Sequence, residues 1–353
     1  MKIFISGTAW IGIIKEDIAE GFKENGIEPI ILNYTDVKTS YESYYKTLKL
    51  HQINYFNKKH FDNKIVKYNN EVIEKSRKLR PDLFLTFSGG FLLPSTVDFL
   101  RNNLKVKTIS IVADNPFDSS REKYFPMALP YYDHIFVCDS IWIENISKVV
   151  GKDVKIHKYT LGYSPKYFYP ISQNEISPLD IENFSCDMSF TGSNYSNKAE
   201  GAYRSGIINQ LDSFNVKLWG DETWKERFIY HKNLQKFYQG IRLSWSDLRK
   251  LYTLSTINLN LPSPQAFTTF QPRTFNVAAV KGFQIIDKRP DLYNYFKEDE
   301  LVTFETIPEL IEKAKYFINN PGDRKSNVEN LYNKIVNRFT WQNQVKLLLD
   351  IIK

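Results

Sequence analysis

The sequence predicts an α/β protein built from two Rossmann-like domains, each a doubly wound sheet of parallel strands. At 353 residues the chain is long for a single hydrophobic core. Short apolar runs of strand length alternate with segments of helical periodicity, which is the order expected of βαβ units. A polar stretch at 171–185, containing Pro178, interrupts this rhythm near the middle. It predicts a linker between the two domains.

The composition is typical of a globular protein, with 42% hydrophobic and 25% charged residues. The net charge of +7 favours contact with polyanions, so nucleic acid, an anionic membrane and nucleotide-sugar phosphates are all permitted partners. The basic residues are scattered among acidic ones, which indicates mostly solvated surface. Two cysteines, Cys138 and Cys186, are too few for a disulfide framework. No apolar run is long enough to span a bilayer, and residues 1–14 lack the features of a leader, so we expect a cytoplasmic location.

The first domain opens with a strand at Lys2–Ser6, a turn, a helix at Ile13–Lys23 and a second strand at Pro29–Leu32. The glycines of this turn do not form G-x-G-x-x-G, and the chain has no P-loop, so no nicotinamide or flavin cofactor is expected. A glycine-led turn lets a ligand approach the backbone closely. Gly7 and Thr8 are therefore candidate ligand-contacting residues.

A candidate catalytic carboxylate follows the predicted strand Thr108–Val112, which ends in Ala-Asp-Asn-Pro. Asp114 and its neighbour Asn115 lie at the carboxyl end of that strand, where ligands of open α/β sheets bind. The alternative is that Asp114 only caps the following turn, a common role for Asp before Asn-Pro.

The second domain is expected to begin with a strand at Asp187–Thr191 that runs into Gly192 and Ser193. Its most informative stretch is 272–287, which predicts a loop carrying Arg273, a short helix and a buried strand. Thr274 is expected to cap that helix, and Gly282 to end it in the left-handed conformation. A helix N-terminus beside a guanidinium suits a phosphate. The alternative is an ordinary αβ unit with a surface arginine.

The stretch PRTFNVAAVKGFQIID, followed by Pro290-Asp291-Leu292 and an acidic turn at 296–300, resembles the C-terminal signature of CgeB-like (spore-maturation type) glycosyltransferases. That pattern is roughly R-x-F-E, a small-residue helix, G-G-F and a strand ending in Asp. This chain departs from it at Asn276, where the family usually has Glu. The resemblance implies the GT-B fold, with two Rossmann-like domains facing across a cleft. It assigns 1–170 to the acceptor side, 171–185 to the linker, 186–339 to the nucleotide-sugar donor, and 340–353 to a terminal helix that crosses back to the first domain.

The resemblance also implies a set of site residues. Arg273, Arg204 and Ser193 are expected to hold the donor diphosphate, and Asn276 the ribose hydroxyls. An Asn in that place accepts one bond and donates another but brings no charge. Lys198 is a competing alignment for the position assigned to Arg204. The segment around Tyr238 and Gly240 is expected to contact the nucleobase through its backbone. Asp114 resembles the D-x-P element of the family and is the candidate base. The full implied set is catalytic Asp114 and Arg273; donor-binding Gly192, Ser193, Arg204, Tyr238, Gly240, Asn260, Arg273, Thr274, Phe275 and Asn276; and acceptor-side Gly7, Thr8, Asp114 and Asn115.

The implied function is transfer of a sugar from a UDP- or GDP-linked donor to an unknown acceptor hydroxyl on a glycan, a protein or a nucleic acid. The sequence has no Asp-x-Asp pair, so transfer without a metal ion or cofactor is expected, with arginines and N–H groups stabilising the leaving diphosphate. Two alternatives remain: a non-catalytic nucleotide-sugar or polyanion binding module, and a sugar-nucleotide epimerase. Release of free nucleotide in the presence of donor and acceptor distinguishes the module from the transferase.

Overall fold

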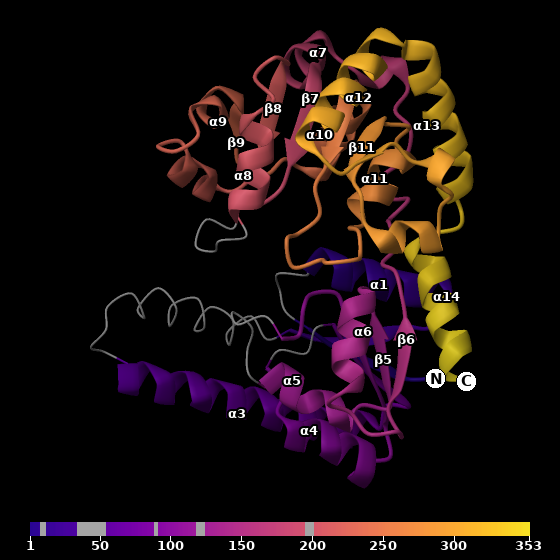
Figure 1. Ribbon diagram of the computed structural model, residues 1–353. Coiled ribbons are helices and arrows are strands. Elements are labelled where there is room, and N and C mark those ends of the chain that lie inside the picture. Colours follow the sequence, from indigo (N-terminus) through magenta and orange to yellow (C-terminus); the bar gives the residue numbers. More distant parts are fainter. Residues whose placement is uncertain (8–11, 34–53, 88–90, 118–123, 195–200) are drawn as a thin grey trace. The chain divides into compact units, whose positions relative to one another are not determined.

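The computed structural model describes residues 1–7, 12–33, 54–87, 91–117, 124–194 and 201–353 (Figure 1). The predicted acceptor-side residue Thr8 and the competing candidate Lys198 lie outside them. The chain divides into two compact units. Unit one consists of Met1–Leu161 and Trp341–Lys353, and unit two of Gly162–Thr340.

Unit one holds a sheet of six parallel strands in the order β2-β1-β3-β4-β5-β6. The order reverses between β1 and β3, which makes the carboxyl ends of these two strands the switch point of the sheet. The strands are β1 (Ile3–Gly7), β2 (Pro29–Asn33), β3 (Leu83–Phe87), β4 (Lys107–Val112), β5 (His134–Val137) and β6 (Lys155–Lys158). The helices are α1 (Gly12–Glu24), α3 (Asn54–Leu79), α4 (Pro94–Asp98), α5 (Tyr124–Ala128), α6 (Ser140–Ser147) and, from the end of the chain, α14 (Trp341–Ile352).

The terminal helix α14 packs against α1, as predicted (Figure 1). Gly21 permits this close approach, because a Cβ there would lie 2.8 Å from the carbonyl oxygen of Trp341. Asn25 fixes the register by donating its side-chain N–H to the carbonyl of Gln342 at 2.9 Å. Trp341 and Leu348 are buried in the core of unit one. The predicted return of the terminal helix to the first domain is confirmed.

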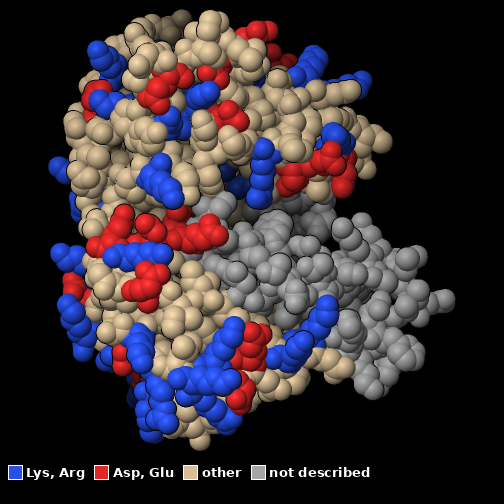
Figure 2. All heavy atoms as spheres, turned by 180° about the vertical axis from the view of Figure 1, so that it is seen from behind, with Lys and Arg blue, Asp and Glu red and all other residues tan. Residues whose placement is uncertain are grey.

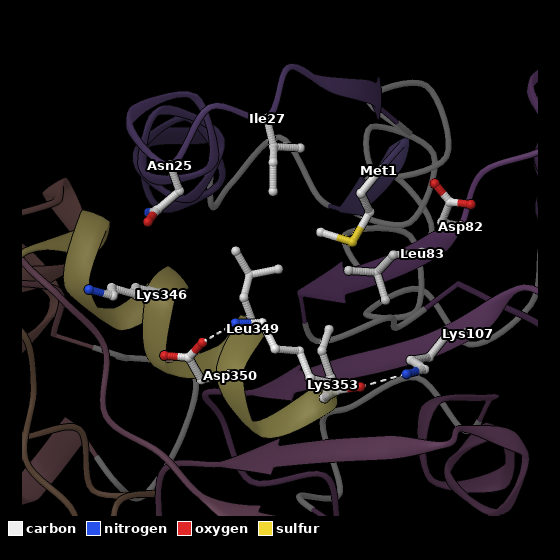
Figure 3. Close-up of a pocket in the computed structure, with 11 residues that line it drawn as sticks. Met1, Asn25, Ile27, Asp82, Leu83, Lys107, Lys346, Leu349, Asp350 and Lys353 are labelled. Carbon is white, nitrogen blue, oxygen red and sulfur yellow. Dashed lines mark hydrogen bonds and ion pairs between the residues drawn. The ribbon is translucent and has the colours of Figure 1, made fainter.

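A cavity of about 460 Å³ lies between α14 and the amino ends of the strands. Figure 3 shows Met1, Leu83 and Leu349 around it, with Lys107 and Asp350 in polar contacts at its margin. Lys107 donates to the carbonyl of Ile352 at 2.5 Å. Ligands of parallel α/β sheets bind at the carboxyl ends of the strands, so this cavity is not a candidate for the main site.

Unit two holds a second sheet of six parallel strands, in the order β12-β11-β10-β7-β8-β9. Its first strand is central, and the order reverses between β7 and β10, as in dinucleotide-binding folds. The strands are β7 (Cys186–Thr191), β8 (Val216–Trp219), β9 (Tyr238–Gly240), β10 (Ser255–Asn260), β11 (Gln284–Asp287) and β12 (Thr303–Phe304). The helices are α7 (Pro178–Phe184), α8 (Gly201–Asn209), α9 (Lys232–Phe237), α10 (Trp245–Leu254), α11 (Arg273–Ala279), α12 (Ile307–Asn319) and α13 (Pro321–Ile335). The prediction of two Rossmann-like domains is confirmed.

The segment 171–185, predicted as a linker, lies within unit two and carries α7. Ser177 caps this helix, because its hydroxyl accepts from the Asp180 N–H. The Asp180 carboxylate in turn accepts from the Ser177 N–H. Asp180 also forms an ion pair with Lys250 on α10 at 2.8 Å. The polar residues that suggested a linker are therefore those that cap a helix and tie it to its neighbour.

The helix α11 begins and ends differently from the prediction. Thr274 lies inside its first turn, fully buried, and Pro272 occupies the cap position without a side-chain bond. At the other end, Lys281 adopts the left-handed conformation (φ 59°), and Gly282 does not. The N–H groups of Lys281 and Gly282 bond to the carbonyls of Ala278 and Val277, which is a Schellman motif. Gly282 is required by packing instead, since a Cβ would lie 2.5 Å from the carbonyl oxygen of Tyr252.

A pair of stacked histidines joins β5 to β6 in unit one. His134 Nδ1 and His157 Nε2 lie 3.0 Å apart. Burial, followed by the neighbouring His157, lowers the pKa of His134 to about 4. Burial and Lys155 lower the pKa of His157 as well. In the unfolded chain both groups titrate near pH 6.5.

We expect this pair to make the protein less stable in acid. Below about pH 6.5 the two histidines bind protons in the unfolded chain but stay neutral in the folded protein. Stability that is present at neutral pH is therefore lost as the pH falls towards 4. Thermal unfolding should show a melting temperature that drops from pH 7 to pH 5. The double variant His134→Asn/His157→Gln should melt with a flatter pH dependence, whatever its stability at pH 7. If the melting temperature of that variant fell as steeply with pH as that of the wild type, other groups would be the cause of the pH dependence.

Candidate active site

The carboxyl ends of β7 and β10 form the candidate site, because they flank the switch point of the second sheet. Thr191 ends β7 and leads into Gly192 and Ser193. Asn260 ends β10 and leads into Leu261. Loops that leave these two strands separate to opposite faces of the sheet, which opens room for a ligand between them.

Arg204 holds the two strand ends together. Its side chain, on α8, is only 1% exposed. Its Nη1 donates to the carbonyl of Ser193 at 2.9 Å, while Nη2 and Nε donate to the carbonyls of Leu261 at 3.0 Å and Pro262 at 3.3 Å. The guanidinium also lies over the ring of Phe190, 5.6 Å from its centroid. Arg204 therefore positions the loops after β7 and β10, and its predicted contact with phosphate stays a prediction.

Arg273 lies beside this clamp with its charge less engaged. Its guanidinium lies 5.3 Å from the centroid of the same Phe190 ring, and Nη1 makes a long contact of 3.4 Å to the Leu261 carbonyl. Its Nη2 lies 3.2 Å from the position that a Cβ on Gly192 would take. In the part of the chain that the structure describes, no carboxylate pairs with it. A half-buried guanidinium without a carboxylate, at a switch point, is suited to an anion.

Gly192, Gly220 and Gly240 lie at the carboxyl ends of β7, β8 and β9, with Gly192 next to Arg273. We call the backbone at these three positions the glycine floor. Gly192 has a φ of 154°, its N–H donates to the Trp219 carbonyl at 3.0 Å, and its carbonyl accepts from the Trp224 indole at 2.8 Å. A Cβ on Gly220 would lie 2.2 Å from that carbonyl and 2.3 Å from the indole nitrogen. Gly220 is thus required for the indole to hold Gly192. Neither Gly220 nor Trp224 was predicted as a site residue, because their role depends on a contact 28 or more positions away in the chain.

The predicted residues Tyr238 and Gly240 come to the same floor through β9. The carbonyl of Gly240, whose φ is 136°, accepts the N–H of Gly220 at 3.0 Å. The ring of Tyr238 packs edge-on against Phe228, with centroids 5.8 Å apart. Burial raises the pKa of the Tyr238 hydroxyl. The structure therefore brings Gly192, Gly220 and Gly240 together along one edge of the sheet.

Three other predicted donor-binding residues are fully buried and brace α11. Asn260 donates from Nδ2 to Thr274 Oγ1 at 2.9 Å and to Gln284 Oε1 at 3.1 Å. Gln284 donates in turn to the Thr274 carbonyl at 2.9 Å. Phe275 stacks on Phe339 with centroids 4.6 Å apart. These contacts tie α11 to β10 and β11, and so fix the base of the Arg273 side chain.

Asn276 lies one turn after Arg273, so the two side chains share a face of α11. It is half-buried, and its backbone N–H bonds to the Pro272 carbonyl at 2.9 Å. The structure therefore places the amide and the guanidinium on the same side of a short helix, next to the switch point.

A further cluster lies at the end of β11 and was not predicted. Asp287 accepts from the Tyr203 hydroxyl and from Arg289 Nη2, each at 2.6 Å. Burial and the bond to Asp287 raise the pKa of Tyr203. Tyr203 precedes Arg204 on α8, so adjacent residues reach the ends of two neighbouring strands, β11 and β10. The strand-ending Asp was visible in the sequence, but nothing there linked it to Tyr203.

Three of the predicted acceptor-side residues, Gly7, Asp114 and Asn115, lie in unit one at the carboxyl ends of its strands. Gly7 ends β1. Asp114 follows the end of β4 by two residues and is half-buried. Asn115 Oδ1 accepts from the N–H of Phe117 at 3.0 Å, which forms a local turn. Their catalytic or binding roles stay predictions.

Within the described ranges, no three His, Cys, Asp or Glu side chains gather where they could hold a metal ion. Among the helices described, none is long and apolar enough to cross a membrane.

The glycine at 220 gives a test of this geometry. Gly220→Ala should destabilise the protein by about 1–3 kcal/mol, because the added methyl must displace either the Gly192 carbonyl or the Trp224 indole. Gly206→Ala is the matched control on α8, since a Cβ there meets nothing within 4 Å, and alanine should stabilise the helix by about 0.5–1 kcal/mol. Urea unfolding measures both. A Gly220→Ala protein as stable as the wild type would contradict the contact.

Residues 204–350 match a family model described as "Glycosyl transferase-like". Among curated proteins, no sequence matches the chain. Several solved structures share its fold. A sucrose-phosphate synthase from Thermosynechococcus elongatus matches with a TM-score of 0.67 at 10% identity, covering 100% of this chain and 98% of that one. HepE from Anabaena, solved with UDP-glucose, matches with a TM-score of 0.65 at 12% identity, covering 99% and 100%.

A trehalose-phosphate synthase from Burkholderia xenovorans, solved with glucose-6-phosphate, matches with a TM-score of 0.68 at 10% identity and covers 100% of both chains. These likenesses span both units and not only the stretch that the family model matches. The chain therefore has the GT-B fold.

Proposed function

We propose that this protein is a glycosyltransferase that moves a sugar from a nucleoside-diphosphate sugar to an acceptor hydroxyl. The observation that carries the proposal is Arg273, a half-buried guanidinium without a carboxylate partner among the described residues, which lies against Gly192 at the switch point of unit two. It belongs to the stretch that matches the glycosyltransferase-like family model.

UDP is the nucleotide that we propose, ahead of GDP. HepE, which shares this fold, was solved with UDP and with UDP-glucose. We propose that the diphosphate lies between Arg273 and the loop after β7, and that the nucleobase lies over the Gly220–Gly240 edge. Asn276, on the same face of α11 as Arg273, is proposed to bond the ribose hydroxyls.

In the proposed mechanism, Arg273 stabilises the negative charge that grows on the leaving diphosphate as the bond to the sugar breaks. Its fork of N–H donors makes charge-assisted bonds that strengthen as the charge develops. A fixed guanidinium in this position takes the part that a divalent cation plays in metal-dependent transfer, so we propose that no metal ion is needed. Arg204 acts through position alone, because it holds the backbone against which the diphosphate would lie.

We propose that Asp114 accepts the proton of the attacking acceptor hydroxyl. It follows the carboxyl end of β4 in unit one, which is where a ligand of that sheet would bind. The acceptor is proposed to be a hydroxyl of a glycan, a protein or a nucleic acid. Asn276 in place of the usual Glu favours one alternative, a module that binds nucleotide-sugar without transfer. Donor binding without release of UDP in the presence of acceptors would support that alternative.

The proposed function predicts which donor binds and whether a metal ion is needed. A ligand that binds only the folded state raises its melting temperature. In a thermal-shift panel of UDP-, GDP-, dTDP- and CDP-sugars, we expect UDP-sugars to give the largest rise, and EDTA to leave that rise unchanged. A rise that appears only with magnesium or manganese would contradict the proposed role of Arg273, and no rise with any donor would contradict the function.

A separate prediction concerns Arg273. Arg273→Ala should lose on the order of 2–4 kcal/mol of transition-state stabilisation, because the guanidinium is proposed to bond most strongly to the charged leaving group. Both donor affinity and kcat should fall. Arg273→Lys should recover only part of the loss, since an ammonium has no planar fork. Steady-state release of UDP measures these variants.

Asn276→Ala provides the matched control on the same face of α11. Ribose does not change charge in the reaction, so this variant should raise KM with little change in kcat. Asn276→Glu, which introduces the usual residue of the resembled family, should retain or improve donor binding. Wild-type kinetics for Arg273→Ala would show that the stretch is only scaffold.

A further inference from the structure

The segment 227–242 carries basic residues but no acidic ones. Over the face shown in Figure 2, basic and acidic side chains are interspersed. Within this segment there is no Asp or Glu among sixteen residues, and the basic residues are Arg227, His231, Lys232, Lys236 and Arg242. Just before it, the ordinary pattern holds, since Lys225 pairs with Glu222 at 3.1 Å. The segment is therefore a local concentration of positive charge.

The same segment carries the three most exposed large apolar side chains among the described residues. Ile229 is 78% exposed, Tyr230 75% and Ile241 65%. Other apolar residues of the segment, Leu234 and Phe237, anchor it in the core of unit two. The three exposed side chains are therefore not needed for that packing. Single exposed apolar residues are ordinary, but three of them amid cations on sixteen residues indicate a surface that contacts something apolar and anionic.

The segment is held in place by its neighbours. It forms α9 and β9, and among the described strands β9 lies at one end of the sheet, next to β8 (Figure 1). Asn233 ties α9 to the end of α8 through two bonds, a backbone N–H to Asn209 Oδ1 at 3.2 Å and its Nδ2 to the Asn209 carbonyl at 2.8 Å. The Phe228 and Tyr238 rings join its two ends. The exposed apolar side chains thus extend from an ordered margin of unit two.

Lys232 and Lys236 are both exposed and, among the residues described, neither pairs with a carboxylate. Some other surface lysines of unit two are paired, as in Lys281 with Glu329 at 2.8 Å and Lys288 with Glu305 at 2.5 Å. The exposed Lys315 and Lys325 resemble the α9 lysines, since no carboxylate among the described residues pairs with them. The two α9 lysines lie four positions apart, so they share a face of the helix. Their charges are available to an anionic partner.

We propose that the segment 227–242 docks on the surface of an anionic membrane. Ile229, Tyr230 and Ile241 enter the boundary between headgroups and acyl chains, and Lys232 and Lys236 contact headgroup phosphates. The long lysine side chains suit this arrangement, because their methylene stems lie along apolar surface while the ammonium stays at the phosphates. A nucleic acid would satisfy the lysines but would leave two exposed isoleucines without an apolar environment, so the membrane is favoured.

Membrane docking by this segment does not depend on the proposed transfer reaction. It does have a consequence for the site, because Ile241 follows Gly240, whose carbonyl bonds to Gly220 in the candidate site. Docking through Ile241 brings that edge of unit two to the lipid surface.

Co-sedimentation with vesicles tests the proposal on the full chain. The protein should sediment with vesicles of phosphatidylcholine and phosphatidylglycerol, less with phosphatidylcholine alone, and less again as salt increases. Lys232→Glu/Lys236→Glu should weaken binding to the anionic vesicles on the order of tenfold or more, because the two side chains would then repel the headgroup phosphates. The matched control is Lys315→Glu/Lys325→Glu, which changes the net charge equally at exposed positions on α12 and α13 and should bind more tightly than the α9 variant.

The apolar half of the proposal has its own pair of variants. Ile229→Ser/Ile241→Ser should lose on the order of tenfold in vesicle affinity, because two aliphatic side chains no longer enter the lipid. Leu179→Ser/Ile181→Ser is the control, since both residues are exposed on α7, and it should bind as the wild type does. Melting temperatures confirm that each variant folds. Equal binding by test and control variants would overturn the proposal. The proposal would also be overturned if the protein bound a single-stranded oligonucleotide and not vesicles, and if the serine variants bound that oligonucleotide equally well.

Discussion

The buried guanidinium of Arg204 is the interaction on which the candidate site depends. It spans the switch point of the second sheet by donating to the backbone that follows β7 and to the backbone that follows β10. Without Arg204, the carbonyls of Ser193, Leu261 and Pro262 would need water as their hydrogen-bond donor. The backbone after β7 and β10 would then be held less firmly. A buried charge is costly unless several hydrogen bonds satisfy it. Arg204 meets that condition with three carbonyls and the face of Phe190.

Arg204 also affects its neighbour Arg273. Both guanidinium groups contact the same Phe190 ring and the same Leu261 carbonyl. Two cations so placed raise the local positive potential, and an anion between Arg273 and the glycine floor would relieve it. The two arginines therefore have different roles. Arg204 fixes the backbone through its hydrogen bonds, and Arg273 has N–H donors left for a ligand. The glycines at 192, 220 and 240 complete the arrangement by letting backbone and indole approach more closely than any side chain would permit.

The fold was predictable from the sequence because alternating strand and helix periods determine a doubly wound sheet, and both sheets follow that pattern. The stretch 272–287 also contains a loop, a helix and a strand in the predicted order. What could not be predicted is the direction of individual side chains. Thr274, a plausible cap, is instead buried against Asn260, and Lys281, not Gly282, takes the left-handed position. The Tyr203–Asp287 bond joins residues 84 positions apart, and no local pattern indicates such a contact.

A crystal structure of the protein with UDP tests the central claim most directly, because the diphosphate either lies at the switch point of unit two or does not. The account predicts that its oxygens lie within hydrogen-bond distance of the Arg273 guanidinium and of backbone N–H groups in the loop after β7. It also predicts that Arg204 keeps its bonds to the carbonyls of Ser193 and Leu261. A diphosphate bound elsewhere, with Arg273 turned towards solvent, would contradict the account.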